Sequence, residues 1–526
     1  MVVSRTKQWP ARRKVRIELD PIRSKIMPLA AAAGKVQSRR QGKRVVHCHG
    51  VFDLLHIGHI RHLEQARRMG DLLVVTVTPD RFVNKGPGRP AFNETLRAEA
   101  IAALTCVDIV AINDWPRADE TIRLLRPEIF VKGSEYRDAQ RDQTGHISIE
   151  EEAVSEVGGK LAFTEDITFS SSNLINQYLS VLPEPTRDYI GRFGSKYGAN
   201  AAIKYIKGAR PLKVLLVGDA IIDEYQYCNA IGKSSKEPIL AVKHVNTERF
   251  AGGILAVANN VAGFCDQAVV AAVLGDENRH EAFITSSLKA NVRSAFFTRS
   301  QGPTIVKRRF IDPYFFQKLF EVYEMDDTPL SGSEHDRFCD VLAGRLHEFD
   351  VVIVVDFGHG TITDRMMSIL CSKAKFLAVN AQSNAANVGY HTISRYERAD
   401  FVCIAENELR LETRSRHGDL KPMVEHVSRD LSSPRVVVTR GSQGSLCYDE
   451  REGFVEVPAL ATIVKDRMGA GDTFMSIAAL CAAQQAPMEV VGFIGNAAGA
   501  QAVATVGHRE SLAQVPLIRH IECLMK

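Results

Sequence analysis

The segment Arg44-Val-Val-His-Cys-His-Gly-Val-Phe-Asp-Leu-Leu-His-Ile-Gly-His59 gives the first indication of how the chain folds. Its apolar beginning predicts a buried strand, Gly50 predicts a turn, and a helical stretch follows over residues 58–69. Strands and helices then alternate, with strands expected at residues 71–78, 108–112 and 129–131 and helices at 94–104 and 120–125. Such alternation predicts a parallel sheet with helices on both faces.

The same alternation begins again after residue 211. Strands are expected at residues 214–218, 351–355, 376–379, 401–404 and 435–439, with helical segments between them. The fold class is therefore α/β, with two doubly wound domains, the first of them Rossmann-like. We expect a basic, disordered arm over residues 1–43, a first domain over 44–182, a linker with some helix over 183–211 and a second domain over 212–526.

Composition places the chain among ordinary globular proteins. Hydrophobic residues make up 45% and charged residues 24% of 526 positions, which excludes a fibrous or mainly disordered protein. No apolar run approaches the ~18 residues of a membrane-spanning helix, so we expect no membrane span and a cytoplasmic enzyme. Ten scattered cysteines without a CxxC pair predict buried free thiols of a reducing compartment rather than a disulfide or zinc framework.

The net charge of +4 is distributed unevenly. Residues 1–44 hold thirteen Lys and Arg against Glu18 and Asp20, a local balance of +11 that leaves −7 for the remainder. A basic arm of this kind could contact nucleic acid or anionic lipid. However, it carries no interleaved aromatic residues beyond Trp9, and no nucleic-acid-binding module accompanies it. A solvated tail is the favoured interpretation, and no nucleic-acid partner is expected.

Two histidines straddle a glycine where the first strand turns into a helix. Amides at a helix start point toward an anion, Gly58 allows close backbone approach, and the imidazoles of His56 and His59 can donate to phosphate oxygens. The alternative is that both are packed histidines. Metal binding is a weaker alternative, because His47 and His49 alternate along a strand and no Cys or carboxylate spacing completes a zinc set.

Later motifs support the phosphate interpretation. They are Lys85-Gly-Pro-Gly-Arg89-Pro90, Lys132-Gly133-Ser-Glu-Tyr136 and Ser170-Ser-Ser172-Asn173. In this order, residues 44–180 resemble the HxGH nucleotidyltransferases of the cytidylyltransferase-like superfamily. They are most similar to the adenylyltransferase half of the bifunctional heptose kinase/adenylyltransferases.

The resemblance implies roles for individual residues. His56 and His59 would contact the triphosphate, and Lys85 would neutralise phosphate charge. The remaining nucleotide- and phosphate-binding positions would be Phe52, Asp53, Gly58, Lys132, Ser170, Ser171 and Ser172. ATP is favoured as the nucleotide, with CTP open. Ser134 and Glu135 depart from the family pattern, which leaves the acceptor sugar open.

The second motif is Gly469-Ala470-Gly471-Asp472, followed by an apolar helical run. Small residues before a helix form a nest of backbone amides that can bind a transferred phosphate. Asp472 is placed to take a proton from a hydroxyl nucleophile. Phosphoryl transfer is mainly positioning and charge stabilisation, so these parts are sufficient. The alternative is a glycine-rich turn before a core helix.

Residues 213–520 resemble the ribokinase-like carbohydrate kinases of the PfkB family, and within it the heptose 7-phosphate kinases. The resemblance implies that Asp472 is the base and that Gly469, Ala470 and Gly471 form the anion hole. It places Asp219, Asp223, Gly252, Gly253 and Asp356 at the sugar, and Thr439, Gly441, Gly444 and Asn496 at the adenine nucleotide. Glu408 would organise Mg²⁺ indirectly.

The chain departs from this family pattern at four positions: Ala256, Asn380, Ala405 and Met468. Each change removes or alters a polar contact, and a buried contact is worth about 1 kcal/mol. A kinase-like half that only binds and regulates is therefore the alternative to an active kinase.

Together the motifs predict a magnesium-dependent, bifunctional enzyme that makes a nucleotide-activated sugar. Its partners would be sugar phosphates and nucleotides, with a homodimer through the second domain left open. The transferase precedes the kinase, the reverse of the order in the bifunctional heptose enzymes.

Overall fold

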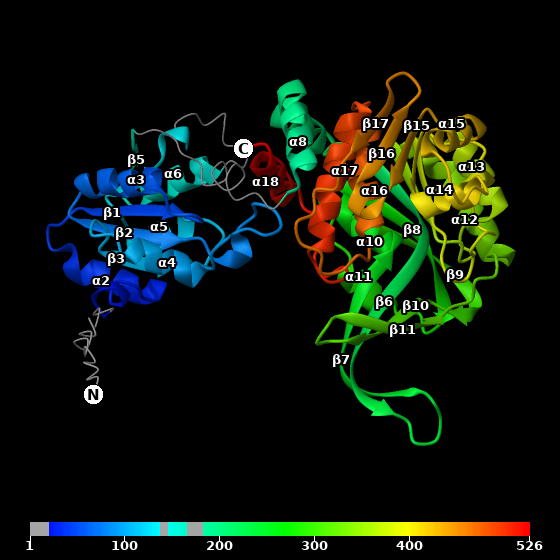
Figure 1. Cartoon of the computed structure of the whole chain (residues 1–526), viewed down its shortest axis with the longest axis horizontal. Coiled ribbons are helices and arrows are strands. Elements are labelled where there is room, and N and C mark those ends of the chain that lie inside the picture. The colour runs from blue at the N-terminus through cyan, green and yellow to red at the C-terminus, as the bar shows by residue number, and fades with distance from the viewer. Residues whose placement is uncertain (1–19, 137–145, 166–181) are drawn as a thin grey trace, which may run out of the picture. The chain divides into compact units, whose positions relative to one another are not determined.

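The computed structural model describes residues 20–136, 146–165 and 182–526 (Figure 1). The chain forms two compact units. Of the described residues, the first unit comprises 20–83, 89–136 and 146–165, and the second comprises 84–88 and 182–526.

The first unit contains a five-stranded, entirely parallel sheet in the order β3-β2-β1-β4-β5. Its strands are β1 (Val45–Gly50), β2 (Leu72–Val77), β3 (Ile109–Ile112), β4 (Ile129–Lys132) and β5 (Lys160–Phe163). Its later helices are α3 (Ile57–Arg68), α4 (Glu94–Ala102), α5 (Asp119–Leu125) and α6 (His146–Glu156). The strand order reverses between β1 and β4, and ligands of such sheets bind at this switch point, beyond the carboxyl ends of the strands.

The described part of the basic arm is folded, which corrects our expectation of disorder over residues 1–43. After α1 (Asp20–Arg23), the helix α2 (Leu29–Arg40) buries Leu29, Ala32, Ala33 and Val36 against the sheet. Their spacing of three, four and seven residues forms one helical face, which the surrounding positive charge concealed. Residues 1–19 lie outside the described part of the chain.

The second unit is built on the long strand β6 (Lys213–Lys233), whose two halves belong to different layers. Its first half lies in a parallel sheet with β8 (Gln267–Glu277), β9 (Val292–Pro303), β12 (Val351–Asp356), β13 (Leu377–Ala381), β14 (Phe401–Ala405) and β15 (Arg435–Thr439). The antiparallel strands β16 (Ser445–Asp449) and β17 (Gly453–Val457) complete its edge.

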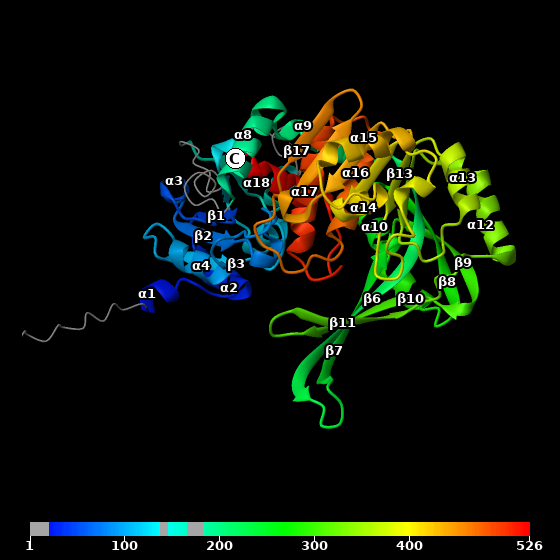
Figure 2. The same ribbon diagram turned by 45° about the vertical axis from the view of Figure 1, so that its right-hand side comes forward.

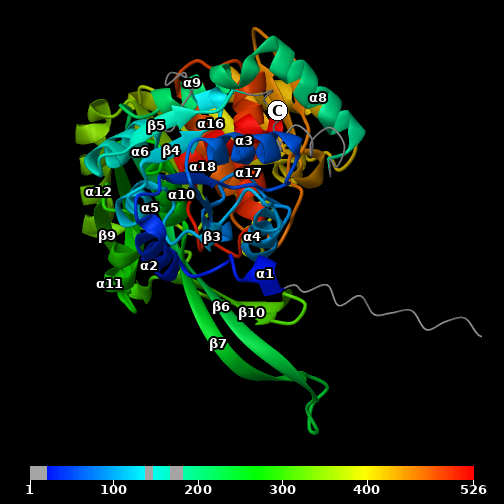
Figure 3. The same cartoon turned by 90° about the vertical axis from the view of Figure 1, so that its left-hand side faces the viewer.

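The second half of β6 leaves this sheet and forms a lid. It pairs with β7 (Leu240–Gly253) as a hairpin and with β10 (Ile305–Asp312), which in turn pairs with β11 (Gln317–Glu324). The β6–β7 hairpin projects from the helical layers of its unit (Figures 2 and 3). One continuous strand therefore joins the main sheet to the lid.

Helices cover both faces of the main sheet (Figure 1). One face packs against α10 (Ile254–Val261), α16 (Ala470–Ala483), α17 (Met488–Val503) and α18 (Gln514–Leu524), and the other against α12 (Gly332–Arg345), α13 (Asp364–Lys373) and α15 (Leu420–Asp430). Short helices α11 (Glu281–Ser287) and α14 (Glu406–Glu412) complete this unit.

Residues 183–211, expected to be a linker with some helix, are almost entirely helical. They form α8 (Glu184–Lys196) and α9 (Gly198–Gly208), whose apolar faces join the core of the second unit. The Phe193 ring stacks on Phe493 of α17 at a centroid distance of 4.1 Å. The compact second unit thus begins before the first strand that the sequence indicated.

All ten cysteines are free thiols, and nine of them are buried, as the sequence predicted. Among the described residues, no helix has the length and apolar character needed to cross a membrane.

Candidate functional site

The start of α16 forms the nest predicted at Gly469-Ala470-Gly471. Gly469 is in the left-handed region at φ 74° and immediately precedes the helix. A Cβ at this position would lie 2.9 Å from Nε2 and 3.0 Å from Nδ1 of His508, and closer still to Cε1. A Cβ at Gly471 would meet no atom within 4 Å. The nest therefore requires glycine at its first position and leaves open space at its third.

Asp472 lies in the first turn of α16 and is 8% exposed. The Gln382 side chain donates to its Oδ1 at 2.6 Å. Burial raises the pKa of Asp472, against the opposing effects of His508 and Gln382. A raised pKa makes a carboxylate a better proton acceptor, which suits a general base.

Asp219 and Asp223 both lie on β6, four residues apart, so they lie on the same face of the strand. Asp219 is fully buried, and its Oδ2 accepts from the backbone N–H groups of Phe357 at 3.0 Å and His359 at 3.5 Å. Burial, and then the nearby Asp356, raise the pKa of Asp219. Asp223 is paired with Arg309 of the lid strand β10. The two carboxylates therefore lie where the main sheet meets the lid.

The glycine pair lies against the same two residues of β6. β7 pairs with β6 so that Gly252 is opposite Ile221 and Gly253 is opposite Ala220. A Cβ at Gly252 would overlap the Asp223 carboxylate, and one at Gly253 would lie 2.6 Å from the Asp219 carbonyl oxygen. A side chain at either glycine would therefore displace β6, the strand that carries Asp219 and Asp223.

Asp356, at the end of β12, is held by the protein itself. Its Oδ2 accepts from the Tyr396 hydroxyl at 2.8 Å, and its Oδ1 accepts from the Gly358 N–H at 3.0 Å. His391 Nε2 lies 3.1 Å from the same Oδ1. Arg395 lies 3.0 Å from His391 Nδ1, and although burial lowers the pKa of His391, the nearby Asp356 raises it above its usual value. In this structure Asp356 fixes the turn that follows it.

Glu408 is also held by backbone groups. Its Oε2 accepts from the Ala405 N–H at 2.7 Å, and its Oε1 accepts from the Ser383 N–H at 3.0 Å. Burial raises the pKa of Glu408, although both amide contacts oppose this. No group of three His, Cys, Asp or Glu side chains within the described ranges is placed to hold a metal. Mg²⁺ fits here only as part of the nucleotide substrate, which retains waters and phosphate ligands.

The predicted nucleotide positions gather at one edge of the sheet. Thr439 of β15 is paired with Ser445 of β16, and Asn496 of α17 donates to the Ser445 hydroxyl at 2.8 Å. Gly444, at φ 84°, would bring a Cβ into the Val457 carbonyl, so it is required by the turn. Gly441 has φ 55° and no atom within 4 Å of such a Cβ. The structure brings Thr439, Gly444 and Asn496 together.

Two residues for which the sequence predicted no role in the site complete this region. Lys307 of β10 is buried, and its Nζ lies 5.1 Å from the Tyr323 ring centroid and 5.2 Å from that of Phe357. Burial lowers the pKa of Lys307, opposed chiefly by Asp223. His508 packs on Gly469, with Nε2 3.7 Å from Asp223 Oδ2. The register of the lid strand, which the sequence does not reveal, places Lys307 here.

In the first unit, His56 and His59 lie together at the start of α3. His56 is the N-cap, and its Nδ1 accepts from the Gly58 N–H at 3.1 Å. The two imidazoles stack at a centroid distance of 3.9 Å, and Phe52 meets the His59 ring edge-on at 5.3 Å. This places the predicted pair at the carboxyl end of β1, beside the switch point.

Asp53 organises the neighbouring loop. Its Oδ1 accepts from the Ala91 N–H at 2.6 Å, and Arg89 lies 3.4 Å from its Oδ2. The buried Arg97 donates to the Val51 and Thr78 carbonyls, so it fastens the same loop to the sheet. The structure thus gives Asp53 a supporting position behind the histidine turn.

Lys132, at the end of β4, forms a 2.7 Å ion pair with the buried Glu150. Burial, and then Lys132, lower the pKa of His47 to about 3 and that of His62 to about 4. His47 and His49 both contact the Thr76 hydroxyl, at 2.8 and 2.9 Å. These hydrogen bonds, with a further one from Thr78, occupy Nε2 of His47 and both ring nitrogens of His49.

Lys85 lies in the segment Asn84–Gly88, which belongs to the second compact unit, whereas His56 and His59 belong to the first. Ser170, Ser171 and Ser172 lie outside the described residues.

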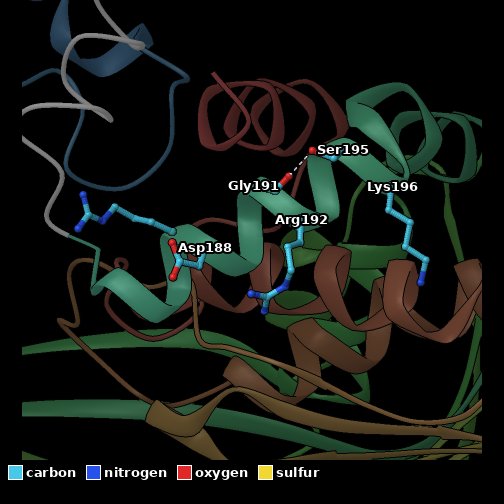
Figure 4. A pocket seen from close by; sticks show the side chains of 6 residues that line it. Asp188, Gly191, Arg192, Ser195 and Lys196 are labelled. Atoms are coloured by element: carbon cyan, nitrogen blue, oxygen red, sulfur yellow. Dashed lines mark hydrogen bonds between the residues drawn. The ribbon is translucent and has the colours of Figure 1, made fainter.

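A surface hollow elsewhere contains none of the predicted site residues. It runs along α8 and is lined by Arg187, Asp188, Gly191, Arg192, Ser195 and Lys196 (Figure 4). Ser195 donates to the Gly191 carbonyl within the helix, and Lys196 pairs with Glu489. It is an open helix surface rather than an enclosed site.

The sequence matches two family profiles. The pfkB family of carbohydrate kinases matches residues 211–514, and the cytidylyltransferase-like family matches residues 47–177. The bifunctional protein HldE of Desulfatibacillum aliphaticivorans is 40% identical over 169 residues, which are 31% of this chain and 33% of that protein. HldE of Citrifermentans bemidjiense is 46% identical over 110 residues, 20% of this chain and 22% of that protein. The chain thus spans a third or less of these relatives.

Solved structures of two sugar kinases align with part of this chain at low identity. Escherichia coli phosphofructokinase-2 in complex with substrates and products aligns over 60% of this chain and 100% of its own, with 16% identity and a TM-score of 0.49. Arabidopsis thaliana ribokinase with ribose and ATP aligns over 60% and 99%, with 18% identity and a TM-score of 0.46. These likenesses are too distant to carry an argument about function.

A helix that opens on an amide nest, with a buried carboxylate in its first turn, is suited to a kinase that activates a hydroxyl group. The matching profile covers more than half of the sequence, and the chain belongs to the pfkB family of carbohydrate kinases. Ahead of that domain it carries a cytidylyltransferase-like domain. The α/β fold class, both families and the order of the two domains are those that the sequence predicted.

Proposed function

We propose that this chain is a bifunctional enzyme of nucleotide-sugar synthesis. Its second domain phosphorylates a sugar phosphate with MgATP, and its first domain transfers a nucleotidyl group to a sugar 1-phosphate with release of pyrophosphate. We propose heptose 7-phosphate as the kinase substrate, phosphorylated at the anomeric position, and AMP from ATP as the transferred group. HldE, a bifunctional protein by its name, supports the pairing of two activities in one chain.

The observation that carries the kinase proposal is the start of α16. Asp472 lies in the first turn, and the nest residues Gly469, Ala470 and Gly471 immediately precede it. In the proposed reaction Asp472 takes the proton of the attacking sugar hydroxyl. The nest amides then stabilise the charge on the transferred phosphoryl group. Mg²⁺ arrives with ATP and neutralises charge on its phosphates.

The acceptor sugar is proposed to lie over the carboxylates of β6. Asp219 and Asp223 accept hydrogen bonds from its hydroxyls, while Gly252 and Gly253 allow close approach of the lid strand. The edge formed by Thr439, Gly441, Gly444 and Asn496 is proposed to hold the adenine nucleotide. Glu408 orients a water of the hydrated Mg²⁺ rather than binding the ion itself.

In the first domain, the stacked imidazoles of His56 and His59 support the nucleotidyl-transfer proposal. Both lie at a helix start, where backbone amides favour an anion. Their role would be to stabilise charge on the α-phosphate during in-line attack by the sugar 1-phosphate. Phe52, Asp53, Gly58 and Lys132 shape and support this turn. Lys85 and Ser170, Ser171 and Ser172 are proposed as additional phosphate contacts.

One observation favours a second candidate, a nucleotidyltransferase whose kinase-like half only binds and regulates. The Gln382 side chain already donates to Oδ1 of the proposed base, so this oxygen is hydrogen-bonded before any substrate binds. A ³¹P NMR assay with MgATP and D-glycero-D-manno-heptose 7-phosphate separates the two candidates. An anomeric phosphate formed by the wild type and not by Asp472→Asn supports the kinase.

The matched control is Asp340→Asn, a charge change at an exposed position of α12. It should leave phosphorylation unchanged. The transferase half is tested separately, with heptose 1-phosphate and either ATP or CTP, by release of pyrophosphate. Activity that survives His59→Ala undiminished contradicts the proposed first-domain site.

A further inference from the structure

His359 lies in the tight turn that follows β12, and its imidazole is unusual in having no hydrogen-bond partner among the residues that the structure describes, although it is buried. The residue is fully buried, and neither Nδ1 nor Nε2 has a hydrogen-bond partner in the described part of the chain. Buried polar atoms nearly always have partners, so a fully buried imidazole with none requires an explanation. A ligand or an ordered water is the usual one.

The turn itself is firmly held, so the unpartnered ring does not result from a loose loop. Asp219 Oδ2 accepts from the Phe357 and His359 N–H groups. Asn384 and Asn387 each donate to the Phe357 carbonyl at 2.7 Å, and Arg299 donates to that of His359 at 3.4 Å. Every one of these contacts uses the backbone of the turn. The turn is therefore held by contacts in which the imidazole takes no part.

The groups around this turn indicate what the ring can bind. Asp219 Oδ1 is buried without a hydrogen-bond partner among the described residues, whereas Oδ2 accepts from the turn and the carboxylate also meets the Thr361 side chain. Burial, and then Lys307, lower the pKa of His359 to about 3, so the ring is neutral near pH 7 and offers one donor and one acceptor. The Asp219 and Asp356 carboxylates both accept from backbone N–H groups of this turn, and together their negative charge outweighs that of the single Lys307 cation and disfavours an anion.

We infer that His359 is a substrate-contacting residue of the kinase site, whose imidazole hydrogen-bonds a hydroxyl of the sugar while a neighbouring hydroxyl donates to Asp219 Oδ1. A hydroxyl both donates and accepts, which matches the neutral ring, and an adjacent hydroxyl matches the unpartnered carboxylate oxygen. The ligand class is thus a polyhydroxylated sugar, bound through its hydroxyls and not its phosphate. The inference deepens the proposed function and rests on it for the location of the sugar.

The test compares sugar binding by the wild-type chain, His359→Phe and His359→Gln. Isothermal titration uses D-glycero-D-manno-heptose 7-phosphate, fructose 6-phosphate and ribose as probes, and MgATP separately. Phe keeps a planar ring without nitrogen atoms, whereas Gln restores one donor and one acceptor. We expect His359→Phe to weaken sugar binding about 10-fold or more, with MgATP binding unchanged and partial recovery in His359→Gln. His426→Gln, at an exposed histidine of α15, is the matched control.

Thermal unfolding separates a ligand role from a structural one. Because the ring makes no hydrogen bond to the protein, His359→Phe should unfold at or above the wild-type temperature. A lower unfolding temperature with unchanged sugar affinity would assign the ring to an internal water and overturn the inference. Unchanged affinity without any loss of stability overturns it as well.

The same data distinguish this inference from the proposed function. A wild type that binds a sugar but forms no sugar phosphate contradicts the kinase proposal and leaves the inference standing. Phosphorylation with the same KM in His359→Phe contradicts the inference alone. A wild type that binds none of the three sugars contradicts both.

Discussion

Replacing Gly469 by alanine tests whether the nest before α16 is the phosphoryl-transfer site. The added Cβ would lie 2.9 and 3.0 Å from the two ring nitrogens of His508 and closer still to Cε1, well inside the ~3.5 Å of ordinary carbon contacts. Either His508 or the first turn of α16 must therefore move by roughly 1 Å. The left-handed backbone at φ 74° adds about 1–2 kcal/mol of strain for a non-glycine residue.

Two consequences follow from this geometry. The free energy of unfolding of the second domain should fall by roughly 1–3 kcal/mol, the sum of backbone strain and a crowded contact. A displacement of about 1 Å at the reacting groups should lower kcat of the kinase about 100-fold. Nucleotidyl transfer by the first domain should remain at the wild-type rate. Steady-state kinetics of both reactions and urea unfolding measure these effects.

Gly344→Ala is the matched control, because Gly344 is an exposed residue of α12 and a Cβ there meets no atom within 4 Å. It should raise the free energy of unfolding by about 0.5–1 kcal/mol through helix propensity and leave both activities unchanged. A Gly469→Ala chain with wild-type kcat and stability would refute the assignment of this nest.

Three further predictions concern charge. Gln382→Leu removes a hydrogen bond that lowers the pKa of Asp472, so the acid limb of the kinase pH profile should move to higher pH; an unmoved limb would show that Asp472 is not the titrating base. Lys132→Met leaves Glu150 buried without its ion-pair partner, so the free energy of unfolding measured in urea at pH 7 should fall by about 3 kcal/mol. A loss below ~1 kcal/mol would mean that water solvates Glu150 in place of Lys132. Folding lowers the pKa of His62 from 6.5 to about 4, so its contribution to stability is present above pH 6.5 and is lost as the pH falls toward 4. His62→Phe should reduce this acid-induced loss of unfolding free energy by up to ~3 kcal/mol. If the unfolding free energy falls equally between pH 7 and pH 4.5 in the wild type and in His62→Phe, the prediction is contradicted.

Motifs whose chemistry is local were predictable from the sequence. The glycines and histidines at both helix starts form their sites within a few residues, so spacing alone placed His56 with His59 and Gly469 with Asp472. No site role was predicted for Lys307 or His359, because their positions in space depend on the register of a lid strand and on a turn held by distant side chains. The helix α2 was missed for a different reason, since its narrow alanine face lies in a strongly basic segment.

The positions that depart from the kinase pattern differ in whether neighbouring groups still make polar contacts there. Ala405 lacks the side-chain amide of the family motif, yet its backbone N–H still orients Glu408, and Asn380 donates to the Cys403 carbonyl at 2.6 Å. Both positions therefore keep a defined polar arrangement. Ala256 lies in α10 at 3% exposure and offers no polar atom beyond its backbone. In the proposed site, the neutral donor and acceptor of His359 would compensate for the side-chain contact that Ala256 does not make.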